Sequence, residues 1–337
     1  MRAKLAAMCW RLLAILTALP VLGCAGESEP EAEDAFRVAL LTPGSIADGG
    51  WNAGAFAGLE RIRDELGAEI RHVETRTPAD FEEGFRDFAG RGFDLVFGHG
   101  FEYQEAAALV AAEFPDTVFI TTSGNTLRPN VAPMVFELEQ AIYLCGVMAA
   151  RLSESGVVGL VGGIDLPSIR STFIAFRGGA EAVRPDVVVR DVFIGNFDDT
   201  AAAREAAWAL MEEGADLLLH QANDAGRGVF RAVGERAAAG SRVFAFGTNR
   251  NQNAMAPTVV LASATLDIPA AFIEVAGRVR DGSFEPQPLR LGMSEGIVAL
   301  EINQALRDRI SDELAQELSA LEAKIRSGEL EVPRGAF

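Results

Sequence analysis

The sequence predicts an α/β fold built from two similar lobes. Apolar runs rich in Val, Ile, Leu and Phe recur along the chain and alternate with segments of helical periodicity. This alternation is typical of βαβ units and parallel sheets. The pattern occurs once before and once after residues 145–156, and the roughly 300 residues from Phe36 onward suffice for two domains of ordinary size. A ligand site between the carboxyl ends of the two sets of strands is the simplest consequence.

The first 35 residues are expected to lie outside this fold. Three positive residues precede or flank an apolar stretch at 12–22 that is too short to span a bilayer as a mature helix. Residues 21–24 (Val-Leu-Gly-Cys) resemble a bacterial lipobox, which predicts a lipoprotein signal peptide at 1–23 and lipidation of Cys24. A plain signal peptide cleaved elsewhere is the alternative, because Leu22 is unusual before Gly-Cys. Residues 24–35 are acidic and favour a disordered, lipid-anchored linker.

Charge and cysteine content exclude several classes of function. The formal net charge is −18 at pH 7 and becomes −21 once residues 1–23 are removed. So acidic a chain is a poor partner for nucleic acid, and we expect no nucleic-acid partner. Cys145 is the only cysteine left in the folded part, so no intramolecular disulfide is available, and its apolar neighbours predict a buried thiol.

The expected elements follow in order along the chain. Strands are predicted at 36–41, 69–73, 94–97 and 117–121 in the first half, and at 157–161, 187–193, 216–220, 242–246 and 259–262 in the second. The helix after the first strand carries Ala55, Leu59, Ile62 and Leu66 on one face and ends at Gly67. Further helices are predicted at 78–89, 103–114, 138–152, 200–211 and 225–239.

After Glu301 the chain becomes charged and helical to about Arg326, with an apolar stripe that we expect to dock on the fold. The N-terminal lobe is expected at 36–145, with a return segment at about 264–290. The C-terminal lobe is expected at 146–263, together with about 291–337 as a terminal strand and helix.

The stretch 42–52, between the first strand and its helix, is the first candidate for a binding site. A strand, a Gly/Pro/Ser-rich turn and a helix place a ligand at the helix N-terminus. Trp51 either packs on its own helix or offers a ring face to a flat ligand. Asn52 either caps the helix or binds a ligand edge, and Asp48 either holds the turn or joins the site.

Neutral polar residues and aromatics follow the strands of the second half. The segments 195–199, 220–224 and 247–252 supply Phe197, Gln221 and Asn249. Rings that stack and amides that both donate and accept suit a flat heterocycle. His99, at a strand end, either touches the ligand or is a structural histidine.

The sequence shows none of the common enzymatic motifs considered below. The three histidines, His72, His99 and His220, show no metal-ligand spacing, and neither a Gly-x-Ser-x-Gly elbow nor a Walker loop occurs. Gly98-His99-Gly100 lacks the third glycine of a dinucleotide fingerprint. We therefore expect no enzyme, no metal and no cofactor.

Five short motifs carry a resemblance to a known family. They are Asp-Gly-Gly-Trp-Asn at 48–52, Gly-His-Gly-Phe at 98–101, Tyr-Leu-Cys-Gly at 143–146, Phe-Arg-Gly-Gly at 176–179 and Gly-Thr-Asn-Arg-Asn-Gln at 247–252. Together they resemble the basic membrane protein family of substrate-binding lipoproteins, which includes purine nucleoside receptors of ABC importers. The resemblance covers nearly all of the chain after Cys24.

This resemblance implies a type I periplasmic-binding-protein fold, with two Rossmann-like lobes joined by a hinge that close on a ligand in the cleft. It implies a purine base held between Trp51 and Phe197, with Asn52 on the base edge. The further candidates for ligand contact are Thr42, Asp48, Gly100, Phe101, Thr122, Gln221 and Asn249. The implied partners are an ABC permease and its ATPase, and the implied state is a monomeric, membrane-anchored lipoprotein of the cell envelope, facing the periplasm or the exterior.

The chain departs from the nucleoside-binding members of this family at four positions. Thr42, Thr122 or Ser123, and Asn249 stand where those members have Asp, and their lysine after the last crossing strand has no counterpart in 263–267. A carboxylate on a ribose hydroxyl contributes about 1.5–3 kcal/mol, against about 0.5–1.5 for a neutral group. The departures favour a purine-type ligand such as adenine over a tightly held nucleoside. A sensor that feeds a membrane signalling protein and a nucleoside-processing enzyme are the alternatives.

Overall fold

The computed structural model describes residues 35–336. The predicted signal peptide, Cys24 and all but the last residue of the linker lie outside the described residues. The described residues from Phe36 onward form one compact unit. No helix in the described part of the chain is long and apolar enough to cross a membrane.

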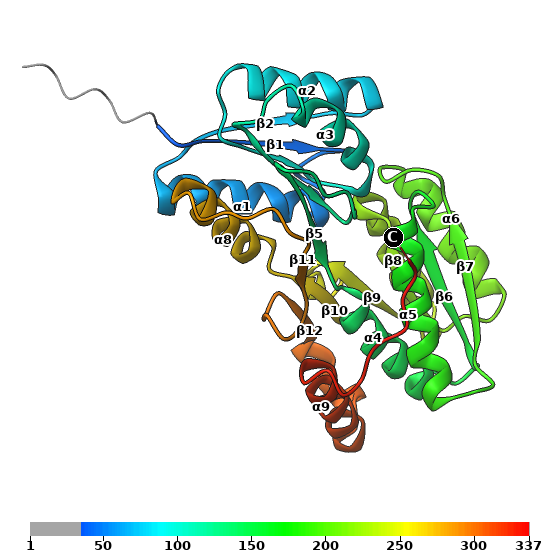
Figure 1. Cartoon of the computed structure of the whole chain (residues 1–337). Helices are drawn as coiled ribbons and strands as arrows, with labels where there is room; N and C mark the ends of the chain where they lie inside the picture. Colours follow the sequence, from blue (N-terminus) through cyan, green and yellow to red (C-terminus); the bar gives the residue numbers. More distant parts are fainter. Residues whose placement is uncertain (1–34, 337) are drawn as a thin grey trace, which may run out of the picture. The chain divides into compact units, whose positions relative to one another are not determined.

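The first lobe is built on a parallel sheet in the order β11-β5-β4-β3-β1-β2 (Figure 1). Its strands are β1 (Arg37–Thr42), β2 (Glu69–Glu74), β3 (Leu95–Gly98), β4 (Val118–Thr122), β5 (Val131–Phe136) and β11 (Leu289–Leu291). Its helices are α1 (Trp51–Leu66), α2 (Pro78–Gly90), η1 (Phe101–Tyr103), α3 (Gln104–Ala111) and α8 (Ile268–Arg280). The order 2-1-3-4-5 is that of a doubly wound sheet, whose ligand crevice opens between the carboxyl ends of β1 and β3.

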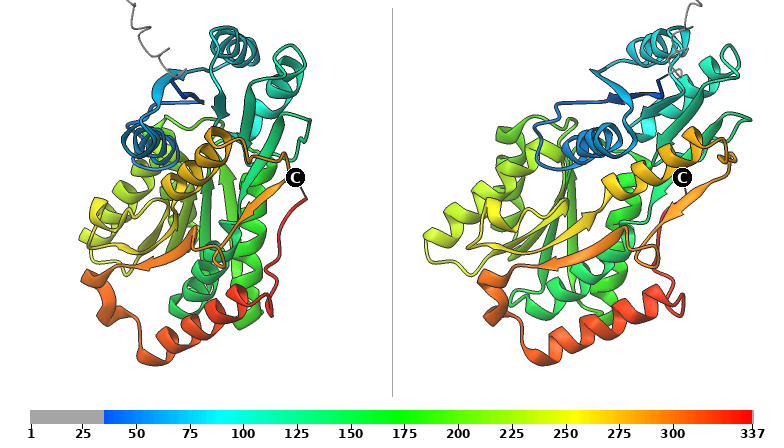
Figure 2. Two further views of the ribbon diagram at one scale, coloured as in Figure 1. Left: turned by 60° about the vertical axis from the view of Figure 1, so that its left-hand side comes forward. Right: turned by 90° about the vertical axis from the view of Figure 1, so that its left-hand side faces the viewer.

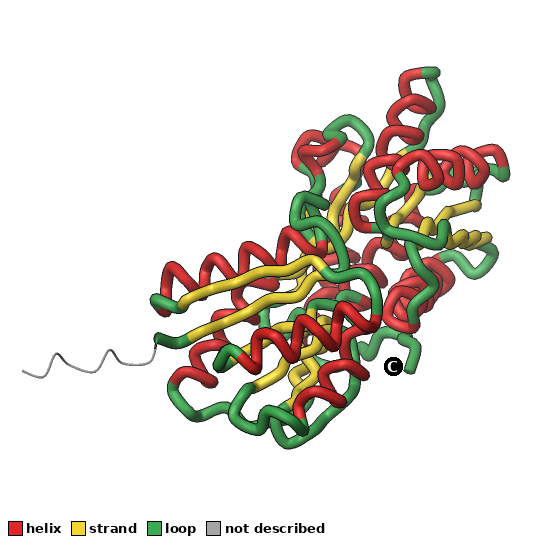
Figure 3. The backbone as a smooth tube through the Cα atoms, turned by 90° about the horizontal axis from the view of Figure 1, so that it is seen from above, coloured by secondary structure: helices red, strands yellow, loops and turns green. Residues whose placement is uncertain are grey.

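Both faces of the central strands of the first sheet are buried, which explains the apolar runs of β1, β3 and β5. Along β1, Val38 and Leu40 join the core cluster that contains α1 and α8, whereas Ala39 and Leu41 join the cluster that contains α2 and α3. This alternation is the period of two that a strand imposes on its side chains. Figure 3 shows strands lying between layers of helices.

The second lobe repeats the arrangement, in the order β12-β10-β9-β8-β6-β7. Its strands are β6 (Val157–Gly162), β7 (Val188–Phe193), β8 (Leu217–Gln221), β9 (Phe244–Asn249), β10 (Val260–Leu266) and β12 (Val298–Ile302). Only β12 runs antiparallel to its neighbour among the strands of this described sheet. The helices are α4 (Glu139–Leu152), α5 (Pro167–Val183), α6 (Thr200–Glu212), η2 (Asn223–Ala225), α7 (Gly226–Ala238), η3 (Asn253–Met255), η4 (Gln304–Arg309) and α9 (Asp312–Arg326).

The chain passes between the lobes after β5, after β10 and after β11. The helix α4 packs against α5 and α9 (Figure 2). The predicted lobe boundary at residue 145 therefore falls inside a helix of the second lobe. Residues 264–266 belong to β10, and α8 returns to pack on α1. The apolar stripe after Glu301 is buried at Leu306, Ile310, Leu314 and Leu318.

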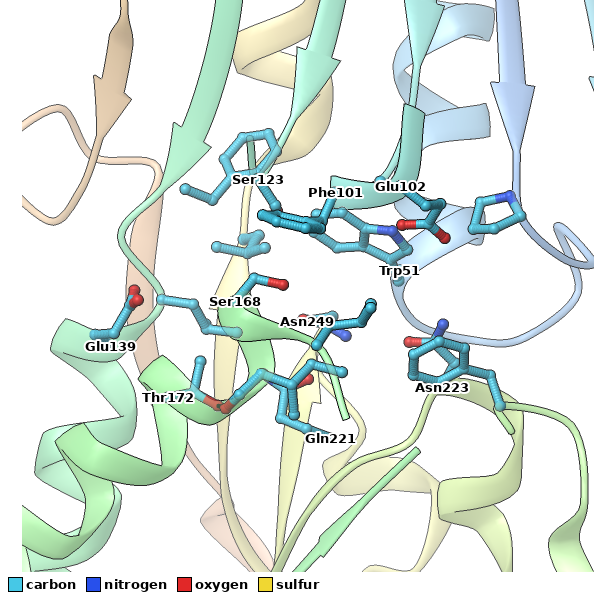
Figure 4. A pocket seen from close by; sticks show the side chains of 18 residues that line it. Trp51, Phe101, Glu102, Ser123, Glu139, Ser168, Thr172, Gln221, Asn223 and Asn249 are labelled. Atoms are coloured by element: carbon cyan, nitrogen blue, oxygen red, sulfur yellow. Dashed lines mark hydrogen bonds between the residues drawn. The ribbon is translucent and has the colours of Figure 1, made fainter. Parts of the chain in front are cut away.

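The prediction of a two-lobed α/β fold with parallel sheets is confirmed. The sequence pattern missed α5 and the strand β5, and gave no bounds for β11 and β12. The missed helix matters most for the site, because the N-terminal turn of α5 reaches the space between the lobes (Figure 4).

Two glycines let α4 and α5 approach each other closely. A methyl group built on Gly146 of α4 would lie 2.1 Å from the carbonyl oxygen of Phe176, and one built on Gly179 of α5 would lie 2.1 Å from that of Tyr143. Both obstacles are backbone atoms, which cannot turn aside as a side chain can. Two of the sequence motifs, at 143–146 and 176–179, are therefore the two sides of one helix contact.

Replacing Gly146 with Ala is expected to destabilise the protein by about 1–3 kcal/mol, because the added methyl overpacks this contact. Gly234→Ala is the matched control: Gly234 lies in α7, and a methyl there meets nothing within 4 Å. That control is expected to be neutral or to stabilise by about 0.5–1 kcal/mol, since Ala favours a helix interior over Gly. Urea denaturation of both variants measures the difference, and equal effects would contradict the packing role of Gly146.

Candidate functional site

A pocket lies between the carboxyl ends of the strands of the two lobes. It encloses about 650 Å³ of empty space, part of which is open solvent. Figure 4 shows side chains from both lobes converging on it. The first lobe and the crossing segments supply Pro43, Trp51, Gly100, Phe101, Glu102, Ser123, Phe136 and Leu138, and the second lobe supplies Glu139, Leu166, Ser168, Ile169, Thr172, Phe197, Gln221, Asn223, Asn249 and Leu266.

Trp51, the first residue of α1, is held firmly in the wall of this pocket. Its indole Nε1 donates to the carbonyl oxygen of His99 at 3.3 Å. One face of the indole stacks on the His99 ring, with centroids 3.9 Å apart and planes 22° apart, and Phe136 meets the indole edge-on at 6.0 Å. Since His99 covers one face of the indole, the other is the face left for a ligand.

His99 supports Trp51 and does not itself line the pocket. The Trp51 carbonyl, 3.1 Å from Nε2 of His99, can only accept, so Nε2 carries the proton. Nδ1 then accepts from the hydroxyl of Thr122 at 3.2 Å. Complete burial lowers the pKa of His99 to about 3, so the ring is neutral at physiological pH. Thr122, a predicted ligand contact, is thus occupied in fixing this histidine.

Two other predicted contacts lie behind the pocket wall. The Asp48 carboxylate accepts from the backbone N–H groups of Gly50, Asn52 and Ala53, so it satisfies the free donors at the start of α1. Burial raises the pKa of Asp48. Thr42 donates to the carbonyl of Gly44 at 2.8 Å and accepts from His72 Nε2 at 2.9 Å.

Asn52, a further predicted contact, is buried and does not line the pocket. A methyl group built on Gly44 would lie 3.2 Å from Asn52 Nδ2, which places the amide against the loop next to Pro43. Its Oδ1 is buried and has no hydrogen-bond partner among residues 35–336. Burying an amide oxygen without a partner costs about 1–3 kcal/mol. This oxygen is therefore an unsatisfied acceptor in the first turn of α1.

The second lobe presents an aromatic ring and amides. The ring of Phe197 lies over Gly163 at the end of β6, where a methyl group would come within 2.2 Å of the ring. Gln221 ends β8 and Asn249 ends β9. Six of the predicted contacts therefore line one pocket: Trp51, Gly100, Phe101, Phe197, Gln221 and Asn249.

Backbone strain concentrates at this pocket. Within the described residues, the non-glycine residues with a positive φ are Ser123, Asn223 and Asn249, with φ of 61°, 46° and 68°. All three line the pocket and lie at or just after the carboxyl end of a strand. Left-handed backbone at a non-glycine residue costs of order 1–3 kcal/mol and clusters at functional sites.

Two carboxylates in the pocket wall were not anticipated from the sequence. Glu139, in the first turn of α4, accepts from Ser171 Oγ at 2.5 Å, and Glu102 lies in η1 next to Phe101. Burial raises the pKa of both, and neither forms an ion pair within the described residues. No group of residues in this part of the chain is arranged to hold a metal ion.

The lobes also contact each other directly beside the pocket. Arg227 of α7 donates to the carbonyl of Ala47 at 2.9 Å, and Arg76 lies 3.3 Å from Asp198. Arg227 belongs to the second lobe and the loop containing Ala47 to the first, so these contacts bridge the two lobes.

The buried histidines predict a loss of stability in acid. An unfolded histidine titrates near pH 6.5, whereas the pKa of His99 falls to about 3 in the folded protein, so the unfolded state binds more protons between these values. Stability is therefore complete above pH 6.5 and falls as the pH falls. Each such histidine is expected to contribute about 2 kcal/mol to the loss between pH 7 and pH 5. His220, with its pKa lowered to about 4, acts in the same direction.

His99→Gln tests this assignment, because it removes one titrating ring and keeps a side chain able to donate and accept. Urea denaturation at pH 7 and pH 5 should show a loss smaller by about 2 kcal/mol in the variant. The raised pKa values of Glu102 and Glu139 act in the opposite sense in both proteins, so they cancel in the comparison. An unchanged loss would contradict a neutral, buried His99.

Comparison with known proteins agrees with this architecture. A family model described as ABC transporter substrate-binding protein PnrA-like matches residues 35–335. Basic membrane protein A of Borreliella burgdorferi is 27% identical and covers 96% of this chain and 94% of its own. A purine-binding protein of Brucella abortus is 27% identical, and the match covers 89% of this chain and 83% of that protein.

A solved structure extends the match to three dimensions. The ABC transporter solute-binding protein of Conexibacter woesei superposes with a TM-score of 0.71 at 32% identity, covering 89% of this chain and 99% of that one. This confirms the fold of two α/β lobes of the type I periplasmic binding proteins. Because the family model spans nearly every described residue, the chain belongs to the Bmp family of PnrA-like ABC transporter substrate-binding proteins, as its motifs predicted.

Proposed function

We propose that this protein is the extracytoplasmic binding protein of an ABC importer and that its ligand is a purine. The observation that carries the proposal is the mounting of Trp51, whose ring is fixed on His99 and bounded by Phe136 within the pocket wall. A rigid indole with one face covered is suited to stacking a flat heterocycle on the other. Phe197 reaches the same pocket from the other lobe, so closing lobes would hold a base between the two rings.

The polar lining supports a heterocycle over a sugar. Gln221, Asn223 and Asn249 each offer an amide that donates and accepts, which matches the mixed edges of a purine. The purine-binding relative from Brucella abortus adds weight to this choice of ligand. The lining includes four aromatic rings, counting Phe101 and Phe136 with the sandwich pair, and these would cover both faces and an edge of a base.

The proposal includes a lipid anchor and no catalysis. Cys24 would carry the lipid after cleavage of residues 1–23, and residues 24–35 would tether the binding unit to the membrane. The permease and ATPase of an importer would be the protein partners of the closed form. A sensor of the same ligand would bind and close in the same way, and the proposal distinguishes it by ligand uptake through a permease.

Trp51→Ala is expected to weaken purine binding tenfold or more, since truncating a large aromatic anchor commonly costs at least about 1–2 kcal/mol. Trp208→Ala is the matched control. Trp208 lies on α6, where it donates to Glu235 at 3.4 Å, and it does not line the pocket. The measurement is isothermal titration of each variant with purine bases and nucleosides, and with ribose and glucose as negative probes.

In this titration the control variant should keep the affinity of the unaltered protein. Binding of sugars alone would overturn the purine assignment while leaving the fold untouched. Purine binding that Trp51→Ala leaves unchanged would remove the indole from the site.

A further inference from the structure

We propose that Glu102 determines which purine binds, by accepting two hydrogen bonds from a guanine-type edge, in which a ring N–H and an amino group lie side by side. This inference rests on the proposed purine-binding function and narrows its ligand class.

Glu102 lies at the edge of the ring on which the ligand would stack. It is the second residue of η1, just past the carboxyl end of β3. A methyl group built on Gly100 would lie 2.5 Å from Oε2 and 3.1 Å from Oε1 of Glu102, so the carboxylate folds back over Gly100. The residue before Gly100 is His99, whose carbonyl receives the indole N–H. The indole edge, the backbone at 99–100 and the carboxylate are thus neighbours, as Figure 4 shows.

The carboxylate of Glu102 is partly buried in the pocket wall, next to the space that a ligand would fill. No arginine, lysine or histidine in residues 35–336 forms an ion pair with it, and no side chain there donates to it. The arginines that bridge the lobes are engaged elsewhere: Arg76 pairs with Glu74 and Asp198, and Arg227 with Asp224. A partly buried carboxylate that no cationic side chain neutralises remains free to accept hydrogen bonds from a ligand in the pocket.

Glu139, the other acid in the wall, differs in this respect. It accepts from Ser171 Oγ, and it lies in the first turn of α4, where the free backbone N–H groups favour a negative charge. Its burial is therefore accounted for within the fold. Glu102 has no such side-chain partner, and it lies on the stacking side of the pocket.

The chemistry of a carboxylate then selects the ligand edge. An ionised carboxylate only accepts, and its two oxygens can receive two parallel donors. Guanine presents the ring N1–H and the 2-amino group side by side on one edge. Hypoxanthine has the N1–H without the amino group, and adenine places an acceptor, N1, beside its amino group. The remaining acceptors of guanine, O6 and N7, can be met by the amides of the second lobe.

The test is isothermal titration of the full chain with guanine and hypoxanthine, which differ only by the 2-amino group. We expect guanine to bind at least tenfold more tightly than hypoxanthine, and Glu102→Gln to reduce that ratio below threefold, because the glutamine amide offers one acceptor in place of two. Retained hypoxanthine binding in the variant shows that it is folded. Glu105→Gln, an exposed acid in the first turn of α3, is the matched control and should keep the full ratio.

Every other outcome of the titration overturns the inference. The outcomes differ in whether they also overturn the proposed purine-binding function. Equal binding of the two bases, or a ratio that Glu102→Gln does not change, refutes the role of Glu102 and leaves purine binding intact. A loss in Glu102→Gln that appears for guanosine and inosine but for neither free base places the carboxylate on ribose hydroxyls instead. Failure of these four purines to bind while adenine binds overturns the inference alone, and failure of adenine as well overturns the proposed function together with the inference.

Discussion

The stacking of Trp51 on His99 is the contact on which the rest of the site depends. The histidine is neutral because it is completely buried, and its ring is held in place by hydrogen bonds from Thr122 to Nδ1 and from Nε2 to the Trp51 carbonyl. A further hydrogen bond joins the same two residues, because the indole N–H of Trp51 donates to the carbonyl oxygen of His99. Rotation of the indole would break both the stacking and the hydrogen bond of the indole N–H, so the ring is oriented before any ligand arrives, which lowers the entropic cost of stacking.

The surrounding fold brings this platform to the second lobe. The crossings that follow β5 and β10 connect the lobes beside the pocket, which Leu138 and Leu266 line, and α4 is fixed to α5 by the close contact at Gly146 and Gly179. The N-terminal turn of α5 then lines the site through Ser168, Ile169 and Thr172. A rigid second lobe, carrying Phe197 on Gly163, can therefore move as a body against the first.

The sequence predicts the strands well where both faces are buried, as in β1 and β8, because the apolar run is then unbroken. It misses β5, where Pro133 stands inside a strand, and α5, where Gly178 and Gly179 interrupt the helical pattern. Residues at strand ends, such as Gln221 and Asn249, are predictable because parallel strands deliver their carboxyl ends to one edge. The positions of Asp48 and Thr122 behind the wall, and of Glu102 in it, depend on hydrogen-bond partners that only the folded chain brings together.

Stacking on Trp51 can be observed directly by fluorescence. After residue 23 the only tryptophans are Trp51 and Trp208, so Trp208→Phe in a chain that begins at Ala25 leaves Trp51 as the single emitter. We predict that a purine changes the emission of Trp51 saturably, at the concentrations at which calorimetry detects binding, and that glucose leaves it unchanged. Calorimetric binding of a purine with no change in Trp51 emission would contradict stacking on this ring, since the ligand would then lie away from the indole.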